Sequence, residues 1–574
     1  MHFNTMKIDD KKIEAYALEN AVKHNGKAQS GSVLASLFAE GLKKEEIKDI
    51  MPTINTIISK VNSMQEGERQ EQYEILKDKI GTHKREVREE GTLPQLPEAE
   101  QGKVVMRFAP FPSGPLHIGN TRQAILNDEY VKMYNGKLIL VIDDTIGSEE
   151  KPIEPEAYKM IPESLDWLKI NYDKKIIYKS DRLETYYAYA EELIKKGYMY
   201  VCSCKSETMR ENREKGIDCG CRHMPEEEHV KRWKKMFDKD TKQGSFAVRL
   251  KTSMQHENPA FRDRVMFRIS EREHPKVKNK YKVWPLLEFS WAIDDHLLGI
   301  THIVRGIDLM METKVEEFIW DIFKWPHPVT LHTGFLRIEG VKISKSKGAK
   351  EVKSGSYLGW NDPRLWSLQS LKDRGIKPEA IREFILSTGM SKANIAIAVD
   401  VLYALNRKYL EKSSRYFFIP EPVTIHIKGC PELEAKLPLH PTENRGFRTY
   451  QTSQDFNIPK QDYENLIDGY YRLMHLLNFK TQKLSPTTER DFSFVSVDPD
   501  TNLKVKFMQW LPAFQKELKT IIRMPDNEIV QGLGEEQIEN LKPGDTIQFE
   551  RFGFVSLYSL DKKARTAEFW FAHK

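Results

Sequence analysis

Two short stretches, far apart in the chain, carry side chains suited to binding phosphate. The first runs from Val104 to Asn120, where an apolar segment is followed by a loop with three prolines and then by His117. The segment from Thr121 to Tyr134 lacks proline and glycine and predicts a helix directly after the loop. The first-turn N–H groups of such a helix have no intrahelical partner and attract an anion. The alternative is an ordinary turn of an α/β protein.

The second stretch is Lys-Ile-Ser-Lys-Ser at residues 342–346. We expect it to follow a hairpin over residues 335–342, with Glu339-Gly340 at the turn. Lysines beside small hydroxyl residues suit a polyphosphate that gains negative charge as it leaves. A solvated basic loop is the alternative for these five residues taken alone.

Charged side chains lie at the ends of predicted buried strands. Arg107 is near the end of the strand over 104–108, and Asp143 directly follows the apolar run from Lys137 to Ile142. A continuous apolar run is typical of a central parallel strand, and ligands bind beyond the carboxyl ends of such strands. Both side chains should therefore face one crevice, where Asp143 suits an ammonium group and Arg107 a carboxylate. The alternative for Asp143 is a helix cap.

Arg305 ends another apolar stretch, so its guanidinium group should have a partner. Arginine binds carboxylates through two parallel hydrogen bonds, which makes Arg305 a candidate for an acidic substrate. The alternative is a structural ion pair with Asp294 or Asp308.

Four of the five cysteines fall within twenty residues, at Cys202, Cys204, Cys219 and Cys221. Four thiolates can close a tetrahedral structural zinc site and would leave no open position for catalysis. The C-x-C spacing is less common in zinc sites than C-x₂-C, and His223 is a substitute ligand. Free reduced thiols on an insertion loop are the alternative.

Composition sets the broad class. With 574 residues the chain is too long for one core, so several domains are expected. Charged residues make up 30% and hydrophobic ones 40%, and the net charge is +5. No apolar run is long enough to span a membrane and no secretory signal opens the chain, so we expect a cytoplasmic protein. Five cysteines in this length argue against a disulfide scaffold.

Sequence patterns also divide the chain. Hydrophobic residues recur at helical spacing over residues 1–90, and residues 91–102 are polar and proline-containing, as in a linker. Residues 226–276 are rich in Lys and Arg with interleaved aromatics, which suits RNA or, without other information, a solvated face. From residue 413 onward, short alternating runs predict β-barrels.

The two phosphate-binding stretches together resemble the signature pair of class I aminoacyl-tRNA synthetases. The "HIGH" motif corresponds to His117-Ile118-Gly119-Asn120, and the "KMSKS" motif to residues 342–346. Residues 104–412 resemble the catalytic part of archaeal-type glutamyl-tRNA synthetases, and the segment from Asp294 to Gly306 resembles their "D-D-H-L-L-G-I-T-H-I-I-R-G". Residues 413–574 are similar to their β-rich anticodon-binding region and 1–90 to their helical N-terminal extension.

This resemblance implies a multidomain fold with a Rossmann-like catalytic domain. Its halves would span 103–200 and 281–350, separated by an acceptor-stem-binding insertion over 201–280 with the zinc site. A helical connecting region would follow over 351–412. The N-terminal module would contact tRNA or dock a protein partner.

The resemblance also implies the reaction and its residues. ATP with Mg²⁺ would activate L-glutamate, and the product would be transferred to tRNA(Glu) and, as in many relatives, to tRNA(Gln). The residues implied in each role follow. Catalysis would involve His117, Asn120, Lys342 and Lys345; ATP binding Pro110, Ser113, Gly114, His117, Gly119, Asn120, Ser344 and Lys345; and glutamate binding Arg107, Asp143 and Arg305.

The chain departs from the family pattern at several positions. Asn120 replaces the last His of the first motif, Val141-Ile142 replaces Arg-Phe, Ile146-Gly147 replaces Asp-Pro, and Leu287 replaces a Tyr that touches the substrate in many relatives. A glutaminyl-tRNA synthetase and a catalytically inactive tRNA-binding relative remain alternatives. Glutaminyl enzymes lack an arginine at the place of Arg305, which favours glutamate.

Overall fold

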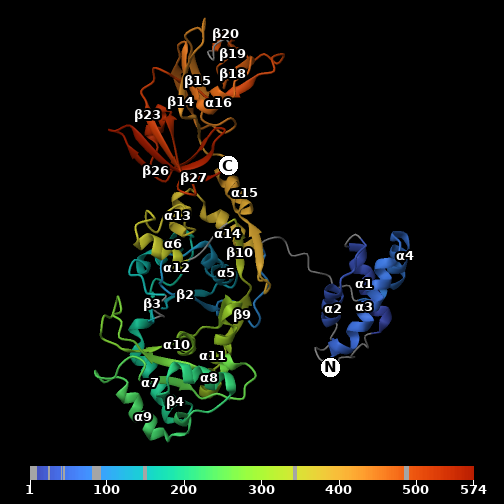
Figure 1. Ribbon diagram of the computed structural model, residues 1–574, viewed down its shortest axis with the longest axis vertical. Coiled ribbons are helices and arrows are strands. Elements are labelled where there is room, and N and C mark those ends of the chain that lie inside the picture. Colours follow the sequence, from blue (N-terminus) through green and yellow to red (C-terminus); the bar gives the residue numbers. More distant parts are fainter. Residues whose placement is uncertain are drawn as a thin grey trace. The chain divides into compact units, whose positions relative to one another are not determined.

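The computed structural model in Figure 1 describes residues 9–23, 26–39, 42, 46–80, 92–146, 151–340, 345–483 and 490–574. It divides into two compact units, residues 1–89 and 90–574. No helix in these ranges is long and apolar enough to cross a membrane.

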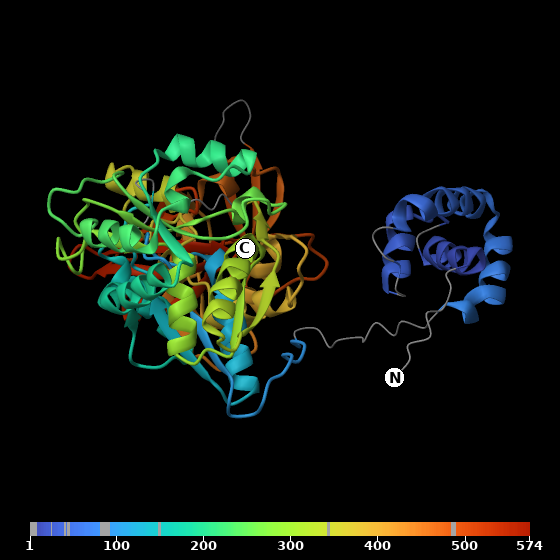
Figure 2. The same cartoon turned by 90° about the horizontal axis from the view of Figure 1, so that it is seen from below.

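The described part of the first unit is helical. Its helices are α1 (Asp10–Lys23), α2 (Ser30–Ala39), α3 (Ile47–Ser63) and α4 (Glu66–Leu76), followed by a 3₁₀ turn, Lys77–Lys79. Helix α1 contacts the other three (Figure 2). Leu18, Val33, Leu37, Ile54 and Val61 are fully buried between the helices, as their three- and four-residue spacing indicated. The first unit therefore has a hydrophobic core of its own.

The second unit is built on parallel strands. In one sheet the order is β1-β2-β3, and two further parallel pairs are β8-β9 and β10-β11. Thr301, just before β8, hydrogen-bonds to the backbone of Val105 in β1, so β8 runs beside β1. The strands are β1 (Val105–Phe108), β2 (Lys137–Ile142), β3 (Ile177–Tyr178), β8 (His302–Gly306), β9 (Val329–Thr333), β10 (Leu336–Glu339) and β11 (Ile395–Ala398).

Helices cover both faces of strand β2. Leu138, Leu140 and Ile142 join the core formed with α5 (Ile118–Met133), α6 (Ala157–Trp167) and α14 (Pro378–Ser387). Ile139 and Val141 point to the opposite face and join the core formed with α7 (Leu183–Lys195), α10 (Leu287–Leu297) and α11 (Met310–Phe323). Burial on both faces explains the continuous apolar run, because successive side chains of a strand point to opposite sides.

An antiparallel sheet interrupts the parallel strands. Its order is β4-β5-β6-β7, with α8 (Ser206–Lys215) and α9 (Glu226–Lys235) between β4 and β5. The strands are β4 (Met199–Cys202), β5 (Ala247–Leu250), β6 (Val265–Ile269) and β7 (Val283–Pro285). This is the segment in which the sequence predicted an insertion.

Two local predictions near the second motif were wrong. No hairpin forms over 335–340, because β10 pairs in parallel with the distant strand β11, Leu336 lying opposite Ile395. The rest of that prediction, residues 341 and 342, lies outside the described residues. The predicted helical connecting region over 351–412 also missed β11, a strand of only four Ile and Ala residues. The helices there are α14 and α15 (Val399–Leu410), preceded by α12 (Lys345–Lys353) and α13 (Leu368–Asp373). Only pairing with a distant partner made this segment a strand.

The C-terminal region is rich in β-strands. A seven-stranded sheet has the order β12-β25-β26-β27-β23-β24-β13 and nearly closes into a barrel, and smaller sheets accompany it. The strands of the large sheet are β12 (Arg415–Tyr416), β13 (Phe418–Pro420), β23 (Leu518–Arg523), β24 (Ile529–Gly534), β25 (Thr546–Phe549), β26 (Gly553–Asp561) and β27 (Thr566–His573). The predicted fold class, a Rossmann-like α/β part followed by β-barrels, is confirmed. The finer domain boundaries stay predictions.

The remaining elements of the C-terminal region form small sheets and one short helix. They are β14 (Pro422–His426), β15 (Glu434–Pro438), β16 (Phe447–Gln451), β17 (Asp455–Pro459), α16 (Lys460–Glu464), β18 (Gly469–Leu473), β19 (Leu477–Lys483), β20 (Arg490–Ser496), β21 (Lys506–Met508) and β22 (Leu511–Pro512). The chain just before β1 also packs on the second unit. Leu96 is buried, and its N–H donates to the Tyr134 hydroxyl group. The predicted linker over 91–102 therefore packs on the second unit in its described part.

Candidate active site

The N-terminus of helix α5 presents the first motif. His117 is the residue before the helix, and its backbone N–H donates a hydrogen bond to Asn120 Oδ1 at 3.2 Å. Asn120 thus satisfies one N–H at the helix start, the role that the third helical residue plays in a capping box. A Cβ atom on Gly119 would lie 2.9 Å from His117 Cε1, so only glycine lets the imidazole ring lie over the first turn. This arrangement places the imidazole ring beside the positive N-terminal end of the helix dipole.

The loop before this helix is tied to the neighbouring strand. The N–H group of Asp143 donates to the carbonyl of Pro110 at 3.1 Å, and Ser113 N–H donates to Phe111 at 2.9 Å. Gly114 has φ +138°, and a Cβ atom there would lie 3.2 Å from the Trp360 ring. The predicted ATP-binding residues of this loop are therefore held in a fixed turn next to the end of β2.

The second motif lies mostly outside the described residues. Lys342 and Ser344 are among the residues not described, and of Lys345 the structure describes the backbone, as the first residue of α12. Glu154 nevertheless connects α12 with the first motif. Its N–H donates to Pro112 at 2.9 Å, and its carboxylate forms an ion pair with Lys353 at the other end of α12. The roles proposed for the three motif residues stay predictions.

Arg107 and Asp143 lie on adjacent strands at the same edge of the sheet, as predicted, and each has a buried counter-ion. Arg107 forms two hydrogen bonds with Asp295 of α10, one of which joins Nη2 and Oδ2 at 2.9 Å. Asp143 Oδ2 lies 3.2 Å from Lys179 Nζ, at the end of β3. All four side chains are at most 6% exposed. The two predicted substrate-binding residues are thus already charge-paired.

Arg305 is paired in the same way. Its Nη1 and Nη2 atoms donate to the two carboxylate oxygens of Glu316 in α11, at 2.9 and 2.5 Å. The sequence offered Asp294 and Asp308 as structural partners, but the partner is Glu316. Burial raises the pKa of Glu316, while the Arg305 charge opposes this shift. No described residue accepts a hydrogen bond from the buried Arg305 Nε.

Trp291 of α10 brings the cations together. Its ring centroid lies 4.5 Å from Arg107 Cζ, 5.0 Å from Lys179 Nζ and 5.1 Å from Arg305 Cζ. The side chain is 5% exposed, and its Nε1 has no hydrogen-bond partner among the described residues. A cation over an aromatic ring is attracted by its quadrupole, and desolvation strengthens the attraction. The predicted residues Arg107, Asp143 and Arg305 therefore belong to one site.

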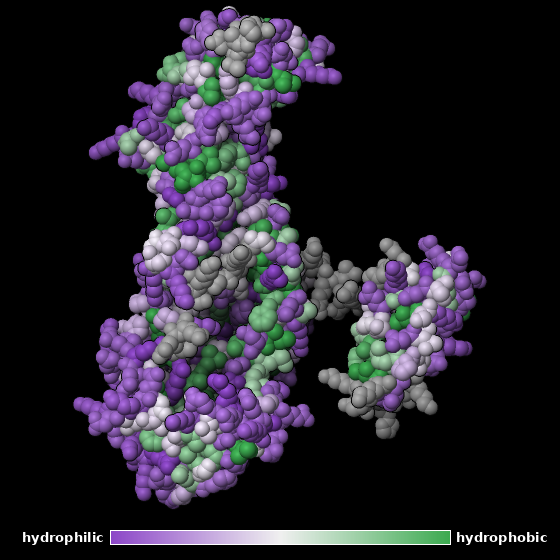
Figure 3. All heavy atoms as spheres, viewed as in Figure 1, coloured by the Kyte–Doolittle hydropathy of each residue, from purple (hydrophilic) through white to green (hydrophobic). Residues whose placement is uncertain are grey.

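Sequence reasoning missed Lys179, Trp291 and Glu316. Lys179 directly follows the short strand β3, so the rule that located Asp143 at a strand end also applied to it. Trp291 and Glu316 lie inside helices, where nothing in their spacing distinguishes them from core residues. In Figure 3 the surface of the second unit is hollowed in the region where Figure 1 draws β2 and α10. The site combines three cations, their three carboxylate partners and two N–H donors without a partner among the described residues, at Arg305 Nε and Trp291 Nε1, and these donors suit an anionic amino acid.

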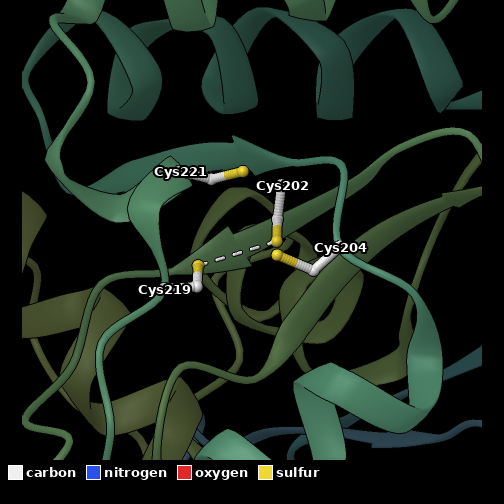
Figure 4. A group of neighbouring side chains, drawn as sticks. All are labelled: Cys202, Cys204, Cys219 and Cys221. Carbon is white, nitrogen blue, oxygen red and sulfur yellow. Dashed lines mark hydrogen bonds between the residues drawn. The ribbon is translucent and has the colours of Figure 1, made fainter.

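The four clustered cysteines point toward one another (Figure 4). Their Sγ atoms all lie within 4.8 Å, and those of Cys202 and Cys219 are 3.8 Å apart. Thiolates about 2.3 Å from a Zn²⁺ ion at tetrahedral angles would be about 3.8 Å apart. His223 is not part of the cluster, since its ring contacts Asp218 on the surface. The donor set and its spacing fit a closed zinc site.

Donors around the cluster favour thiolates. Cys219 Sγ lies 3.8 Å from Arg249 Nη1, and Cys221 Sγ lies 3.6 Å from Arg232 Nη1. The hydrogen bond between Cys202 and Cys219 lowers the pKa of Cys219 and raises that of Cys202, so by itself it favours one thiolate in this pair. A Zn²⁺ ion with four thiolates carries a net charge of −2, which two neighbouring guanidinium groups offset. The zinc interpretation is thus chemically consistent with the surroundings.

Comparisons with known proteins cover almost the whole chain. Residues 103–412 match the family described as "tRNA synthetases class I (E and Q), catalytic domain", and residues 413–498 and 494–558 match two anticodon-binding domains of the same enzymes. Proteins named "Glutamate--tRNA ligase" are 42% identical in Pyrococcus furiosus, over 97% of this chain and 98% of that one, and 40% in Thermococcus kodakarensis, over the same shares. The relative from Methanocaldococcus jannaschii is 39% identical over 96% of this chain and 98% of that one.

A solved structure described as a glutamate tRNA ligase from Elizabethkingia meningosepticum is more distant. It is 22% identical, covers 54% of this chain and 70% of its own, and gives a TM-score of 0.40.

Proposed function

The chain belongs to the class I tRNA synthetases for glutamate and glutamine, and from this premise we propose that it is a glutamate–tRNA ligase. It would use ATP and L-glutamate to charge tRNA(Glu). High identity to archaeal ligases over both full lengths supports the reaction class. The observation that carries the choice of glutamate is the convergence of Arg107 and Arg305 on one buried ring. A carboxylate side chain accepts stronger, charge-assisted hydrogen bonds from guanidinium groups than an amide oxygen does.

In the proposed first step the α-carboxylate of glutamate attacks the α-phosphorus of ATP. The bond between that phosphorus and the β-phosphate oxygen breaks, and pyrophosphate leaves with its electrons. Glutamyl-adenylate remains. Since no protein group forms a covalent bond, the chain contributes positioning and charge. Mg²⁺ bound to ATP supplies further neutralisation of the phosphates.

Named residues would divide this task. The start of α5, with His117 and the loop of Pro110, Ser113 and Gly114, suits the phosphates. Lys345, at the start of another helix, would meet the departing pyrophosphate together with Lys342 and Ser344. Asn120 can donate a hydrogen bond but carries no charge, so it is a weaker donor than the histidine it replaces.

In the second step the 3′-terminal ribose hydroxyl of tRNA attacks the carbonyl carbon of the adenylate, and AMP leaves. The insertion over 201–280 would hold the acceptor stem, and the C-terminal barrels the anticodon. Many relatives also charge tRNA(Gln), and we propose this as a second substrate. The first unit has no catalytic constellation among its described residues and would contact tRNA or a protein partner.

Charging assays test the amino acid directly. The purified chain is incubated with ATP, purified tRNA(Glu) or tRNA(Gln), and labelled glutamate or glutamine. We expect glutamate on tRNA(Glu) at a rate above any glutamine signal by a factor of at least about a hundred, because a site built to donate charge-assisted hydrogen bonds to a carboxylate binds an amide more weakly. Preferential charging with glutamine would contradict the proposal.

We also propose that the cysteine cluster binds one structural Zn²⁺. Its donor set, spacing and neighbouring cations support this. Native mass spectrometry of the intact chain should find one zinc per molecule. Cys219→Ser should lose it, while Cys430→Ser, which changes a buried cysteine outside the cluster, should retain it. Full metal content in Cys219→Ser would refute this zinc site.

A further inference from the structure

Lys179 is enclosed as a ligand ammonium group would be. The residue is fully buried, its Nζ donates to Ser290 Oγ at 2.8 Å and lies 3.2 Å from Asp143 Oδ2, and the face of Trp291 is 5.0 Å away. A carboxylate, a hydroxyl oxygen and an aromatic face are the groups that stabilise an ammonium ion in a dry site. This part of the site is therefore an ammonium cage, and the chain fills it with its own lysine.

Asp143 is the carboxylate that holds this ammonium group. The other acid nearby, Asp294, is occupied, because Arg182 Nε donates to it at 2.7 Å and the Tyr186 hydroxyl at 2.6 Å. Burial lowers the pKa of Lys179, and the charge of Asp143 is the main influence opposing that shift. Loss of either partner would leave the other as an isolated buried charge.

The proposed function gives Asp143 a second ammonium group, that of glutamate. Two ammonium ions on one buried carboxylate repel each other. Resting on that function, we propose that Lys179 takes the place of the substrate ammonium before glutamate binds and competes with it for Asp143. Glutamate binding then requires the Lys179–Asp143 pair to open, so Lys179 sets the affinity for the amino acid.

This competition has a specific signature. Glutarate carries the two carboxylates of glutamate and lacks the ammonium group, so it binds without displacing Lys179. The preference for glutamate over glutarate is therefore small in the unchanged protein. Replacing Lys179 by glutamine keeps an N–H donor on a side chain one atom shorter and removes the competing charge, so that Asp143 is left for the ammonium group of glutamate. The preference for glutamate should then rise.

The test measures ATP–pyrophosphate exchange in the presence of tRNA. For the unchanged protein and Lys179→Gln we compare the KM for glutamate with the inhibition constant of glutarate. In Lys179→Gln the KM should fall about tenfold, and the ratio of the two constants should rise at least tenfold. A purely structural role would change both constants alike. The matched control is Lys137→Gln. Lys137 begins β2, the strand that leads to Asp143, and forms an ion pair with Asp173 on the surface.

Calorimetry on the unchanged protein covers the case in which Lys179→Gln does not fold. With tRNA present, glutarate should bind within about tenfold of glutamate, and a glutarate affinity more than a hundredfold weaker would overturn the inference. An unchanged ratio, or a higher KM for glutamate in Lys179→Gln, would also overturn it while leaving glutamate activation intact. No glutamate-dependent exchange by the unchanged protein would instead overturn the proposed function, and this inference with it.

Discussion

Each charged residue proposed to bind the amino acid has a partner of its own within the protein. Arg107 pairs with Asp295, Arg305 with Glu316, and Asp143 with Lys179. Buried charges are costly without a partner, so these pairs make the site stable before the substrate arrives. Glutamate would then be recognised by donors without a partner among the described residues, such as Arg305 Nε, and by displacing a residue such as Lys179 from its partner. The site is preorganised by charge pairing rather than by open, solvated charges.

A prediction at this scale concerns Lys345. Its replacement by alanine should slow glutamate-dependent pyrophosphate exchange on the order of 10²–10³-fold, since one donor to the developing charge is lost. The dissociation constant for tRNA, measured by filter binding, should stay within about twofold. Lys350→Ala is the control, because Lys350 is exposed in the same helix. Unchanged exchange in Lys345→Ala would refute its catalytic role.

Residue types and spacing identified part of the site. Arg107 and Asp143 were predictable because both lie at ends of apolar runs, and Arg305 because it ends another. Their partners were not predictable, since Arg107 meets Asp295 across 188 residues and Lys179 meets Ser290 across 111. Contacts at such separation depend on how the sheet and the helices pack, and no local pattern encodes them.

At the scale of elements, strand ends and helix starts position the chemistry. Strands β1, β2, β3 and β8 deliver Arg107, Asp143, Lys179 and Arg305 to one edge, and α5 begins beside them. Hydrophobic periodicity predicted most of these elements, because the apolar side chains of each one are buried against its neighbours. It failed for β11, because pairing with β10 rather than local preference makes that segment a strand.

The connection between β6 and β7 supports the end of β2. His274 in this connection is fully buried; its Nε2 donates to the Asp144 carbonyl at 2.7 Å, and its Nδ1 accepts from the N–H groups of Lys276 and Val277 at 3.1 Å. Protonation of Nδ1 would oppose two donors. Burial lowers the pKa of His274, with the Asp144 backbone and charge opposing the shift and Lys276 adding to it.

This geometry predicts a pH-dependent stability. Since the folded-state pKa of His274 is below the unfolded value near 6.5, the unfolded chain gains a proton first as pH falls. The contribution of His274 to the free energy of unfolding should be fully present above pH 6.5. Below that pH it should fall by up to about 1.4 kcal/mol per pH unit. Thermal unfolding between pH 7.5 and 5.5 should show a smaller decline in His274→Gln. The control His426→Gln, which changes an exposed histidine, should lose stability with falling pH as steeply as the unchanged protein. An equally steep loss in His274→Gln would show that His274 does not cause the pH dependence.

At the scale of the whole molecule the chain comprises two units with separate cores. Residues 1–89 have a helical core, and residues 90–574 contain the synthetase domains. Length and helical spacing predicted this division. The sequence could not specify what the first unit binds, because its described residues form no cluster of reactive groups.

Separate cores predict separate unfolding. Ile54 is fully buried in the first unit, so Ile54→Ala should lower the stability of that unit by about 2–5 kcal/mol. Differential scanning calorimetry of the intact chain should show one transition shifted and the other unchanged. Asn55→Ala, on the exposed side of the same helix, should shift neither. A joint shift of both transitions in Ile54→Ala would contradict separate cores.

The most direct test of glutamate activation is ATP–pyrophosphate exchange, with glutamate and glutamine in parallel and each with and without tRNA(Glu). We predict exchange with glutamate, dependent on tRNA, and none above background with glutamine. Exchange with glutamine alone would show that the cations around Trp291 do not select a carboxylate side chain. No exchange with either amino acid, despite tight tRNA binding, would contradict the proposed reaction and favour an inactive tRNA-binding relative.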